Sequence, residues 1–159
     1  ATELQLDLEL WSEALGEDVQ LLVRPHYLNA IRVPAALRQN IVNVSGVGDS
    51  GLVMQASDLL VTDYSSIMFD FLALDRPQVL YTYDLDEYMF TARGTYFDLR
   101  EQSPGPLVFD QEDLMAAVMK RLATDADVVK RHAFRDRYAG IEPGNASAVT
   151  VETVWGEKA

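Results

Sequence analysis

The chain has 159 residues, 48% of them hydrophobic, which is enough apolar side chain for one folded domain with a substantial core. Its net charge of −12, from 25 acidic and 13 basic residues, argues against binding to nucleic acid or to an anionic lipid surface. The chain contains no cysteine, which excludes disulfides and thiolate metal sites, and its two histidines lack metal-binding spacing, so we expect no metal and no cofactor.

The apolar residues alternate between helical and strand patterns along the whole chain. The expected elements are a helix over 4–15, a strand over 19–23, a helical turn over 34–37, a strand over 41–44, a short helix over 52–56, a strand over 58–61, a helix over 67–74, a strand over 78–83, an irregular segment over 84–98, a strand over 107–109, and helices over 111–122, 125–138 and 146–155. Strands that alternate with helices predict a parallel sheet in a three-layer, Rossmann-like α/β domain. No linker interrupts the pattern, so residues 1–159 are expected to form a single domain.

A polar run, Thr62-Asp63-Tyr64-Ser65-Ser66, joins a predicted strand to a predicted helix. In open α/β sheets, ligands bind beyond the carboxyl ends of the strands, where the next helix presents unpaired N–H groups. Serine hydroxyls add further donors there, and the helix dipole favours an anion. The run therefore predicts a phosphate-binding turn, with ordinary helix capping by serine or aspartate as the alternative.

Two basic segments are candidate partners for the same anion. Arg24-Pro25-His26 directly follows a predicted buried strand, where arginine and histidine side chains can contact phosphate oxygens. Its alternative is a surface histidine beside a turn-forming proline. Arg93 lies beside a glycine in the long segment over 84–98 and can also reach a bound anion.

Two other patterns resemble functional motifs, but we interpret both as structural. Residues 46–51 spell GxGxxG after a strand, but the short helix that follows argues against a dinucleotide site. Asp84-Leu85-Asp86-Glu87 gathers carboxylates without the ligand alternation of a calcium loop, which favours a solvated loop or a helix cap over a metal site.

Several segments in fixed order resemble the CDP-glycerol glycerophosphotransferases of teichoic-acid polymerase type. They are Leu-Val-Arg-Pro-His-Tyr-Leu at 22–28, Ser-Asp-Leu-Leu-Val-Thr-Asp-Tyr-Ser-Ser-Ile-Met-Phe-Asp at 57–70, Arg-Pro at 76–77, Tyr-Thr-Tyr-Asp-Leu-Asp-Glu-Tyr at 81–88, Arg-Gly-Thr-Tyr-Phe-Asp at 93–98, Pro-Gly-Pro at 104–106 and Gly-Asn-Ala-Ser at 144–147. The resemblance implies a GT-B-type architecture of two Rossmann-like domains with the active site between them. In that architecture this chain would be the C-terminal, nucleotide-donor half, and a further strand of its domain would precede residue 1.

The resemblance also implies an activity. Such an enzyme transfers glycerol phosphate from CDP-glycerol to a poly(glycerol phosphate) teichoic-acid chain and releases CMP. The catalytic base, the acceptor-binding surface and any membrane contact would belong to the N-terminal half. The complete enzyme would be cytoplasmic and peripheral at the inner face of the cell membrane.

The resemblance assigns roles to individual residues. His26 matches a donor-side histidine that contacts the diphosphate, and when protonated it would stabilise the departing CMP. Thr62, Ser65 and Ser66 match the diphosphate-binding turn, with Arg24 and Arg93 as further contacts. Asp63 belongs to the same turn and either contacts the substrate or, with Asp70, holds the turn and its helix in place.

Alternative functions remain open from the sequence. One is the donor domain of a nucleotide-sugar glycosyltransferase or epimerase of GT-B type, and another is a non-catalytic nucleotide-binding module. The sequence does not separate glycerol from ribitol phosphate, or a primase from a polymerase, and it gives no oligomeric state.

Overall fold

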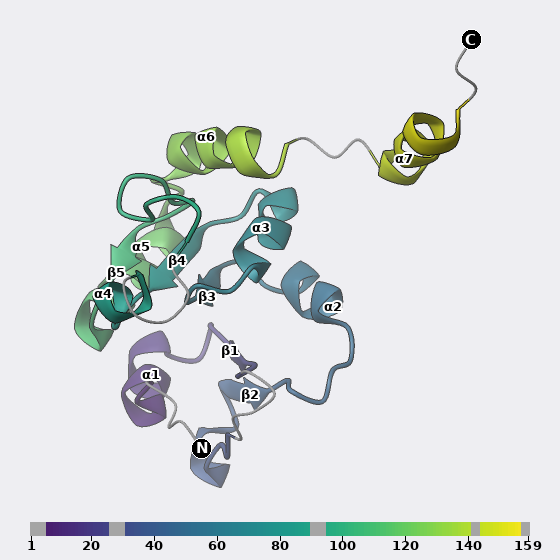
Figure 1. The fold of residues 1–159 in the computed structure, drawn as a ribbon. Coiled ribbons are helices and arrows are strands. Elements are labelled where there is room, and N and C mark those ends of the chain that lie inside the picture. Colours follow the sequence, from purple (N-terminus) through teal and green to yellow (C-terminus); the bar gives the residue numbers. More distant parts are fainter. Residues whose placement is uncertain (1–5, 26–30, 90–94, 141–143, 157–159) are drawn as a thin grey trace.

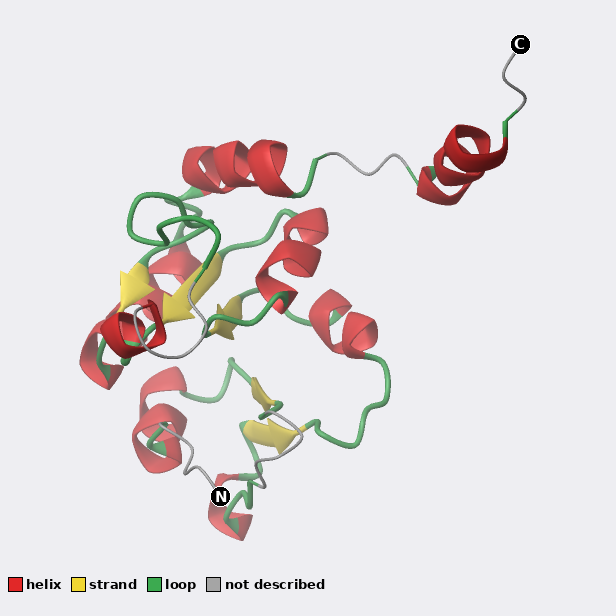
Figure 2. Ribbon diagram, in the orientation of Figure 1, coloured by secondary structure: helices red, strands yellow, loops and turns green. Residues whose placement is uncertain are grey.

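The computed structural model describes residues 6–25, 31–89, 95–140 and 144–156, and shows an α/β fold (Figures 1 and 2). Its elements are α1 (Leu8–Leu15), β1 (Leu21–Val23), the 3-10 helix η1 (Ala35–Leu37), β2 (Ile41–Asn43), α2 (Ser50–Gln55), β3 (Leu60–Thr62), α3 (Ile67–Phe71), the 3-10 helix η2 (Leu72–Leu74), β4 (Gln78–Tyr81), α4 (Leu85–Glu87), β5 (Leu107–Val108), α5 (Gln111–Ala123), α6 (Val128–Tyr138) and α7 (Ala146–Trp155). The predicted alternation of strands and helices is confirmed in order.

All the described strands pair in parallel, as expected, but they lie in two sheets. β1 pairs with β2, and β3, β4 and β5 form a second sheet in that order. Among the described residues, β1 and β3 each pair along one edge only. The parallel α/β class is therefore confirmed, with its strands distributed over two sheets.

The central strand β4 shows why the larger sheet has helices on both faces. Successive side chains in a strand point to opposite faces. Val79 packs in a cluster with residues of α1 and α5, whereas the neighbouring Leu80 packs with residues of α3 and α6. Both side chains are fully buried, which gives the expected three layers around this sheet.

The smaller sheet has its own apolar cluster of Val23, Val33 and Ile41. Leu21 of β1 contacts both this cluster and the one beneath α1 and α5, so it joins the two packing regions. α1 covers the junction because Trp11 and Leu15, four residues apart, are buried on one helix face.

Many boundaries differ from the sequence prediction by one to three residues, and three segments near the candidate site show the differences that matter most. The helix expected over 67–74 is α-helical only to Phe71 and continues as the 3-10 helix η2. The strand expected over 58–61 is β3 at Leu60–Thr62, and the segment expected to be irregular contains the three-residue α4.

α7 lies apart from the other elements in Figure 1, and all of its residues are exposed. Its exposed side chains include the apolar Val149, Val151, Val154 and Trp155. Over the part of the chain that the structure describes, no helix has the length and apolar character needed to cross a membrane.

Candidate functional site: the carboxyl edge of the parallel strands

Because all the strands are parallel, the segments that follow them emerge at one edge of each sheet. For the larger sheet these segments are residues 63–66 after β3, 82–84 after β4, and 109–110 after β5. We call residues 62–66 the 62–66 turn. It is the segment that the sequence predicted to bind phosphate, and it lies at the expected edge.

A local hydrogen bond fixes the shape of the 62–66 turn. The Asp63 carboxylate accepts from the backbone N–H of Ser65 at 3.0 Å. The carbonyls of Ser65 and Ser66 accept from Met68 and Phe69 at 3.2 and 3.0 Å, which starts α3. Asp63 therefore holds the turn by its side chain, the structural role that the sequence offered as one of two possibilities.

The two serine hydroxyls are exposed and differ in what they contact. Ser65 Oγ accepts from the N–H of Ile67 at a long 3.4 Å. Ser66 occupies the N-cap position, but its side chain makes no capping hydrogen bond. The capping alternative therefore does not account for Ser66, and both hydroxyls keep a proton to donate.

Thr62 and Asp70 flank these serines. Thr62 is the last residue of β3, half-buried, and its backbone is in register with Leu80 of β4. Asp70 is exposed in the first turn of α3. The sheet thus fixes the start of the turn, and the helix fixes its end.

Arg24 lies at the carboxyl end of β1, as expected, but its described contacts are to a loop. Its guanidinium donates to the carbonyl of Val44 at 3.3 Å and also to the carbonyl of Val47. These contacts tie β1 to the connection between β2 and α2. The other guanidinium N–H groups make no hydrogen bond to a described residue and can donate to a ligand. His26 and Arg93 lie outside the described residues.

The GxGxxG segment over 46–51 leads into α2, which has only six residues. Asp49 caps this helix by accepting from the N–H of Gly51 at 2.8 Å. The segment is therefore a short capped connection near the carboxyl end of β2.

A contact that sequence reasoning missed ties the 62–66 turn to the segment after β4. The Tyr64 hydroxyl donates to the Asp84 carboxylate at 2.7 Å. The Tyr64 ring stacks on that of Tyr88, with centroids 3.8 Å apart and planes 9° from parallel. Burial and the hydrogen bond to Asp84 both raise the pKa of Tyr64 far above its usual value, so its proton stays in place.

This contact revises the interpretation of the acidic run 84–87. Asp84 precedes α4 but makes no side-chain capping bond, and its carboxylate instead accepts from Tyr64. Asp86 forms an ion pair with Arg100. Over the described ranges, no group of three or more histidine, aspartate and glutamate side chains is placed to hold a metal ion.

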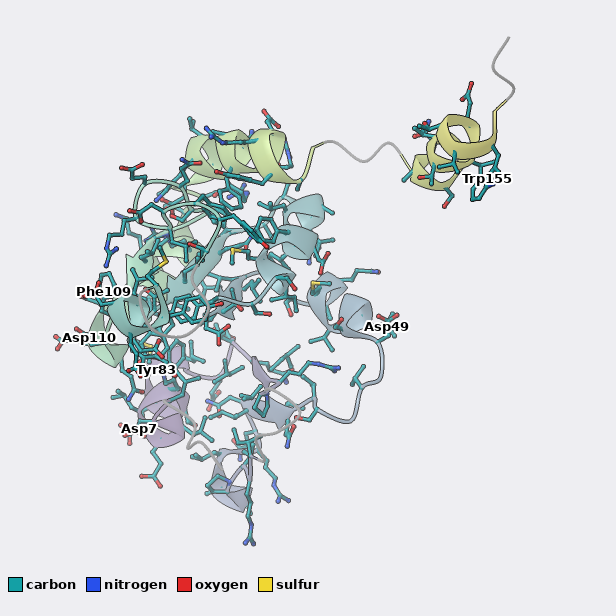
Figure 3. All side chains as sticks on the ribbon, in the orientation of Figure 1. Asp7, Asp49, Tyr83, Phe109, Asp110 and Trp155 are labelled. Carbon is teal, nitrogen blue, oxygen red and sulfur yellow. The ribbon has the colours of Figure 1, made fainter. Side chains whose placement is uncertain are left out.

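Two aromatic side chains, Tyr83 and Phe109, also lie at this edge, and both are labelled in Figure 3. Tyr83 lies two residues after the end of β4 and Phe109 directly after the end of β5, and they are 46% and 51% exposed. Tyr83 packs against Tyr81, with ring centroids 5.3 Å apart. Exposed rings at the same sheet edge as a turn predicted to bind phosphate suit a ligand that joins an anion to a flat base. The strand-end positions of these aromatic residues were a usable signal that the sequence reasoning passed over.

A comparison with protein families identifies the family to which this chain belongs. A family model described as CDP-Glycerol:Poly(glycerophosphate) glycerophosphotransferase matches residues 1–156. The chain belongs to this family. The resemblance inferred from the sequence is thereby confirmed.

Individual relatives agree with this assignment. The chain is 37% identical over 153 residues to a teichoic acid glycerol-phosphate transferase of Staphylococcus aureus (strain NCTC 8325 / PS 47), a match covering 96% of this chain and 39% of the relative. It is similar in structure to the wall teichoic acid polymerase TagF, with a TM-score of 0.82, 34% identity, and coverage of 96% of this chain and 38% of TagF. A TagF variant soaked with CDPG matches with the same TM-score of 0.82. The chain thus spans about two fifths of the length of these relatives.

Proposed function

We propose that this chain is the nucleotide-donor-binding half of a transferase that moves glycerol phosphate from CDP-glycerol to a poly(glycerol phosphate) chain and releases CMP. The single observation that carries the proposal is the 62–66 turn. It presents two exposed serine hydroxyls at the carboxyl edge of a parallel sheet, in a chain of the glycerophosphotransferase family.

The turn suits a diphosphate for chemical reasons. The exposed hydroxyls of Ser65 and Ser66 can each donate a hydrogen bond to a phosphate oxygen, and Thr62 supplies a third hydroxyl at the end of β3. Asp63 takes the role of holding the turn, since its carboxylate is engaged by the Ser65 N–H and would repel an anion. Arg24, which follows β1, and Arg93 are the proposed sources of positive charge, and Tyr83 and Phe109 offer exposed rings to the cytosine base.

The reaction then follows from the bonds that change. A terminal glycerol hydroxyl attacks the β-phosphorus, a new P–O bond forms, and the bond from that phosphorus to the oxygen of CMP breaks. Negative charge develops on the transferred phosphoryl oxygens and on CMP, where donors fixed in advance lower the barrier. His26, if protonated, stabilises the departing CMP or donates a proton to it.

The other half of the complete enzyme would have the remaining roles in the reaction. A GT-B-type partner domain would supply the catalytic base and the acceptor-binding surface, and residues 1–159 would form one Rossmann-like donor domain. The complete enzyme would act at the cytoplasmic side of the membrane, as a peripheral protein held through its other half.

The proposal is tested by calorimetric titration of the chain with CDP-glycerol, CDP, CMP and UDP-GlcNAc. We expect CDP-glycerol and CDP to bind. Replacing Ser65 and Ser66 together by alanine should weaken that binding by about tenfold or more, since two hydrogen bonds to a charged ligand are lost. The matched control is Thr124→Ala, which removes an exposed hydroxyl at the far end of α5.

The outcomes separate the alternatives. Binding of UDP-GlcNAc in preference to CDP-glycerol would contradict the proposal in favour of a nucleotide-sugar transferase. Equal binding of CDP-glycerol by the unsubstituted chain and the double variant would contradict the role of the 62–66 turn. A separate assay of the complete enzyme with His26→Ala tests catalysis, because near-normal turnover there would rule out the role given to His26.

A further inference from the structure

α6 carries a concentration of basic side chains, and the structure divides them into two groups. The first group faces carboxylates. Arg131 Nε and His132 Nε2 each lie 2.9 Å from an oxygen of Asp75, and Arg135 lies 3.7 Å from the same carboxylate. Arg131 also makes two 2.7 Å hydrogen bonds to Asp125. The charge of this first group is therefore compensated within the fold.

Lys130 and Arg137 form the second group, and neither has a carboxylate partner within the described ranges. Lys130 Nζ donates to the carbonyl of Gly105 at 3.2 Å, which uses one of its three protons. The Arg137 guanidinium lies 5.4 Å from the ring centroid of Tyr138 and makes no ion pair with another described residue. Two positive charges thus stay uncompensated in a chain whose net charge is −12.

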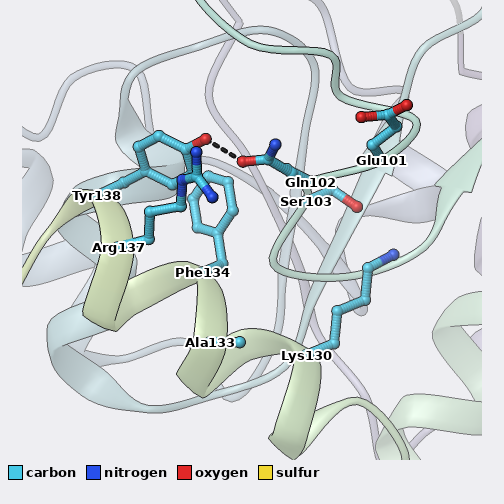
Figure 4. A pocket seen from close by; sticks show the side chains of 8 residues that line it. All are labelled: Glu101, Gln102, Ser103, Lys130, Ala133, Phe134, Arg137 and Tyr138. Carbon is cyan, nitrogen blue, oxygen red and sulfur yellow. Dashed lines mark hydrogen bonds between the residues drawn. The ribbon is translucent and has the colours of Figure 1, made fainter.

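These two cations border one hollow, drawn in Figure 4. The hollow has a volume of about 420 Å³ and lies between α6 and the segment 101–103. That volume is within the range of roughly 300–1,000 Å³ typical of small-molecule sites. Lys130 and Arg137 are seven residues apart, so they lie on the same helix face about 10 Å from each other along the axis. Ala133, between them, leaves room for a ligand because its side chain is small.

The other wall of the hollow adds polar groups. The Tyr138 hydroxyl donates to the side-chain oxygen of Gln102, and Ser103 Oγ donates to the carbonyl of Gly105 at 2.7 Å. The Gln102 amide nitrogen makes no hydrogen bond to a described residue and can donate to a ligand. Glu101 is the one acidic side chain among the lining residues, on the segment opposite α6 (Figure 4).

The hollow is separate from the 62–66 turn. Residues 101–106 lead into the start of β5, and the Pro106 carbonyl accepts from the N–H of Leu80 within the sheet. The 62–66 turn instead follows the end of β3, and the strands are parallel. The segment 101–103 therefore belongs to the amino edge of the sheet and the turn to its carboxyl edge.

We infer that this hollow binds phosphate groups of the poly(glycerol phosphate) chain at a second subsite, apart from the donor and from the acceptor-binding surface of the partner domain; the inference rests on the proposed function for the nature of this polymer. Lysine and arginine both bind phosphate, the former as a point charge and the latter as a fork. Two cations separated by two helical turns suit successive phosphates of a linear polymer better than one compact anion. The net charge of −12 repels a polyanion in general, whereas this hollow offers it two cations on one helix face.

The test is titration of the full chain with a synthetic oligo(glycerol phosphate) of defined length. Lys130→Gln and Arg137→Gln should each weaken binding by about tenfold, because each removes a charge-assisted contact. Glu101→Gln should strengthen binding, because it removes the acid that faces the polymer. Lys120→Gln is the matched control, since it removes an exposed positive charge on α5, outside the hollow, and should leave the affinity unchanged.

Three results would overturn the inference. The first is unchanged affinity for the oligomer in a variant that carries both Lys130→Gln and Arg137→Gln. The second is a loss of oligomer affinity in Lys120→Gln as large as in the Lys130 or Arg137 variant. The third is binding of inorganic phosphate as tight as that of the oligomer. Titration of the same variants with CDP-glycerol keeps the two proposals apart. If CDP-glycerol binds neither the unsubstituted chain nor the variants, the result counts against the donor site. If oligomer binding is lost only in the Lys130 and Arg137 variants, the result supports this subsite, whether or not CDP-glycerol binds.

Discussion

The Tyr64 hydroxyl donates to the Asp84 carboxylate at 2.7 Å and thereby joins the 62–66 turn to the segment after β4. The two residues are 20 positions apart in the chain. The Tyr64 ring stacks on Tyr88, so the same side chain also contacts the segment that follows α4. The turn that we assign to the donor phosphates is thus held from two sides, by its own Asp63 and by Asp84.

Tyr64→Phe removes this hydrogen bond and keeps the ring. The Asp84 carboxylate then loses its partner, and we expect the free energy of unfolding to fall by about 1–2 kcal/mol. Urea denaturation measures the change, with Tyr96→Phe as the control because Tyr96 is fully exposed. A loss in Tyr96→Phe as large as that in Tyr64→Phe would contradict a specific role for the bond.

Gly105 lies against the start of β4, where a larger residue has no room. A Cβ atom at this position would lie 1.9 Å from the backbone carbonyl oxygen of Gln78. Gly105→Ala must therefore displace backbone, and we expect a loss of about 2 kcal/mol or more. Gly46→Ala is the control, since nothing lies within 4 Å of a Cβ there. Equal stability of the two variants by thermal denaturation would refute this close approach.

Arg131 is the buried centre of the ion-pair cluster at the start of α6, with a side chain only 1% exposed. Its guanidinium is satisfied by Asp75 and Asp125, which are themselves partly exposed. Arg131→Ala should cost roughly 2–3 kcal/mol, below the full effect of breaking a wholly buried pair. Arg100→Ala, which breaks the exposed pair with Asp86, should cost under about 1 kcal/mol. Similar losses in the two variants, measured by urea denaturation, would show that burial of Arg131 does not matter.

The same cluster predicts a dependence of stability on pH. Burial alone would raise the pKa of Asp75, but hydrogen bonds from His132 and Arg131 lower it, and the bond from Arg131 lowers the pKa of Asp125. A depressed pKa in the folded state means stabilisation that is present above the usual value of 3.8 and is lost as the pH falls through the folded value.

We therefore expect the free energy of unfolding to decline as the pH is lowered below about 4, and to decline less in Asp125→Asn. Urea denaturation at neutral and acidic pH measures both curves. The Asp86→Asn variant should keep the acid-dependent loss of the unsubstituted chain, because its exposed pair contributes little. An Asp125→Asn curve parallel to that of the unsubstituted chain would contradict this account.

The sequence predicted helices well where an amphipathic pattern and a cap agree. α5 was expected over 111–122 and is found at Gln111–Ala123, because Asp110 caps its start by accepting from the N–H of Asp113 at 2.8 Å. Local signals of this kind are complete within one turn of the helix. The sequence did not predict α4, because a helix of three residues is too short to show an amphipathic pattern.

The division into two sheets could not be read from local patterns, because strand pairing depends on residues far apart in the chain. β3 begins two residues later than predicted because its register with β4 pairs Leu60 with Gln78. The further strand that the family resemblance implies before residue 1 stays a prediction.

The candidate site was predicted in part. The position of the 62–66 turn followed from a strand, a polar run and a helix in succession, and the structure has all three in that order. The partnership of Tyr64 with Asp84, and the use of Arg24 to hold the loop at Val44, depend on tertiary contacts that no local pattern records.

The most direct test of the central claim is to follow the backbone amide signals of the chain by NMR while CDP-glycerol is added. If the 62–66 turn binds the diphosphate, the largest shifts will be those of the Tyr64, Ser65 and Ser66 amides. Cytidine, which lacks the phosphates, should leave these three signals close to their free positions. Shifts that leave the turn unchanged while CDP-glycerol binds elsewhere would contradict the assignment of this turn as the donor site.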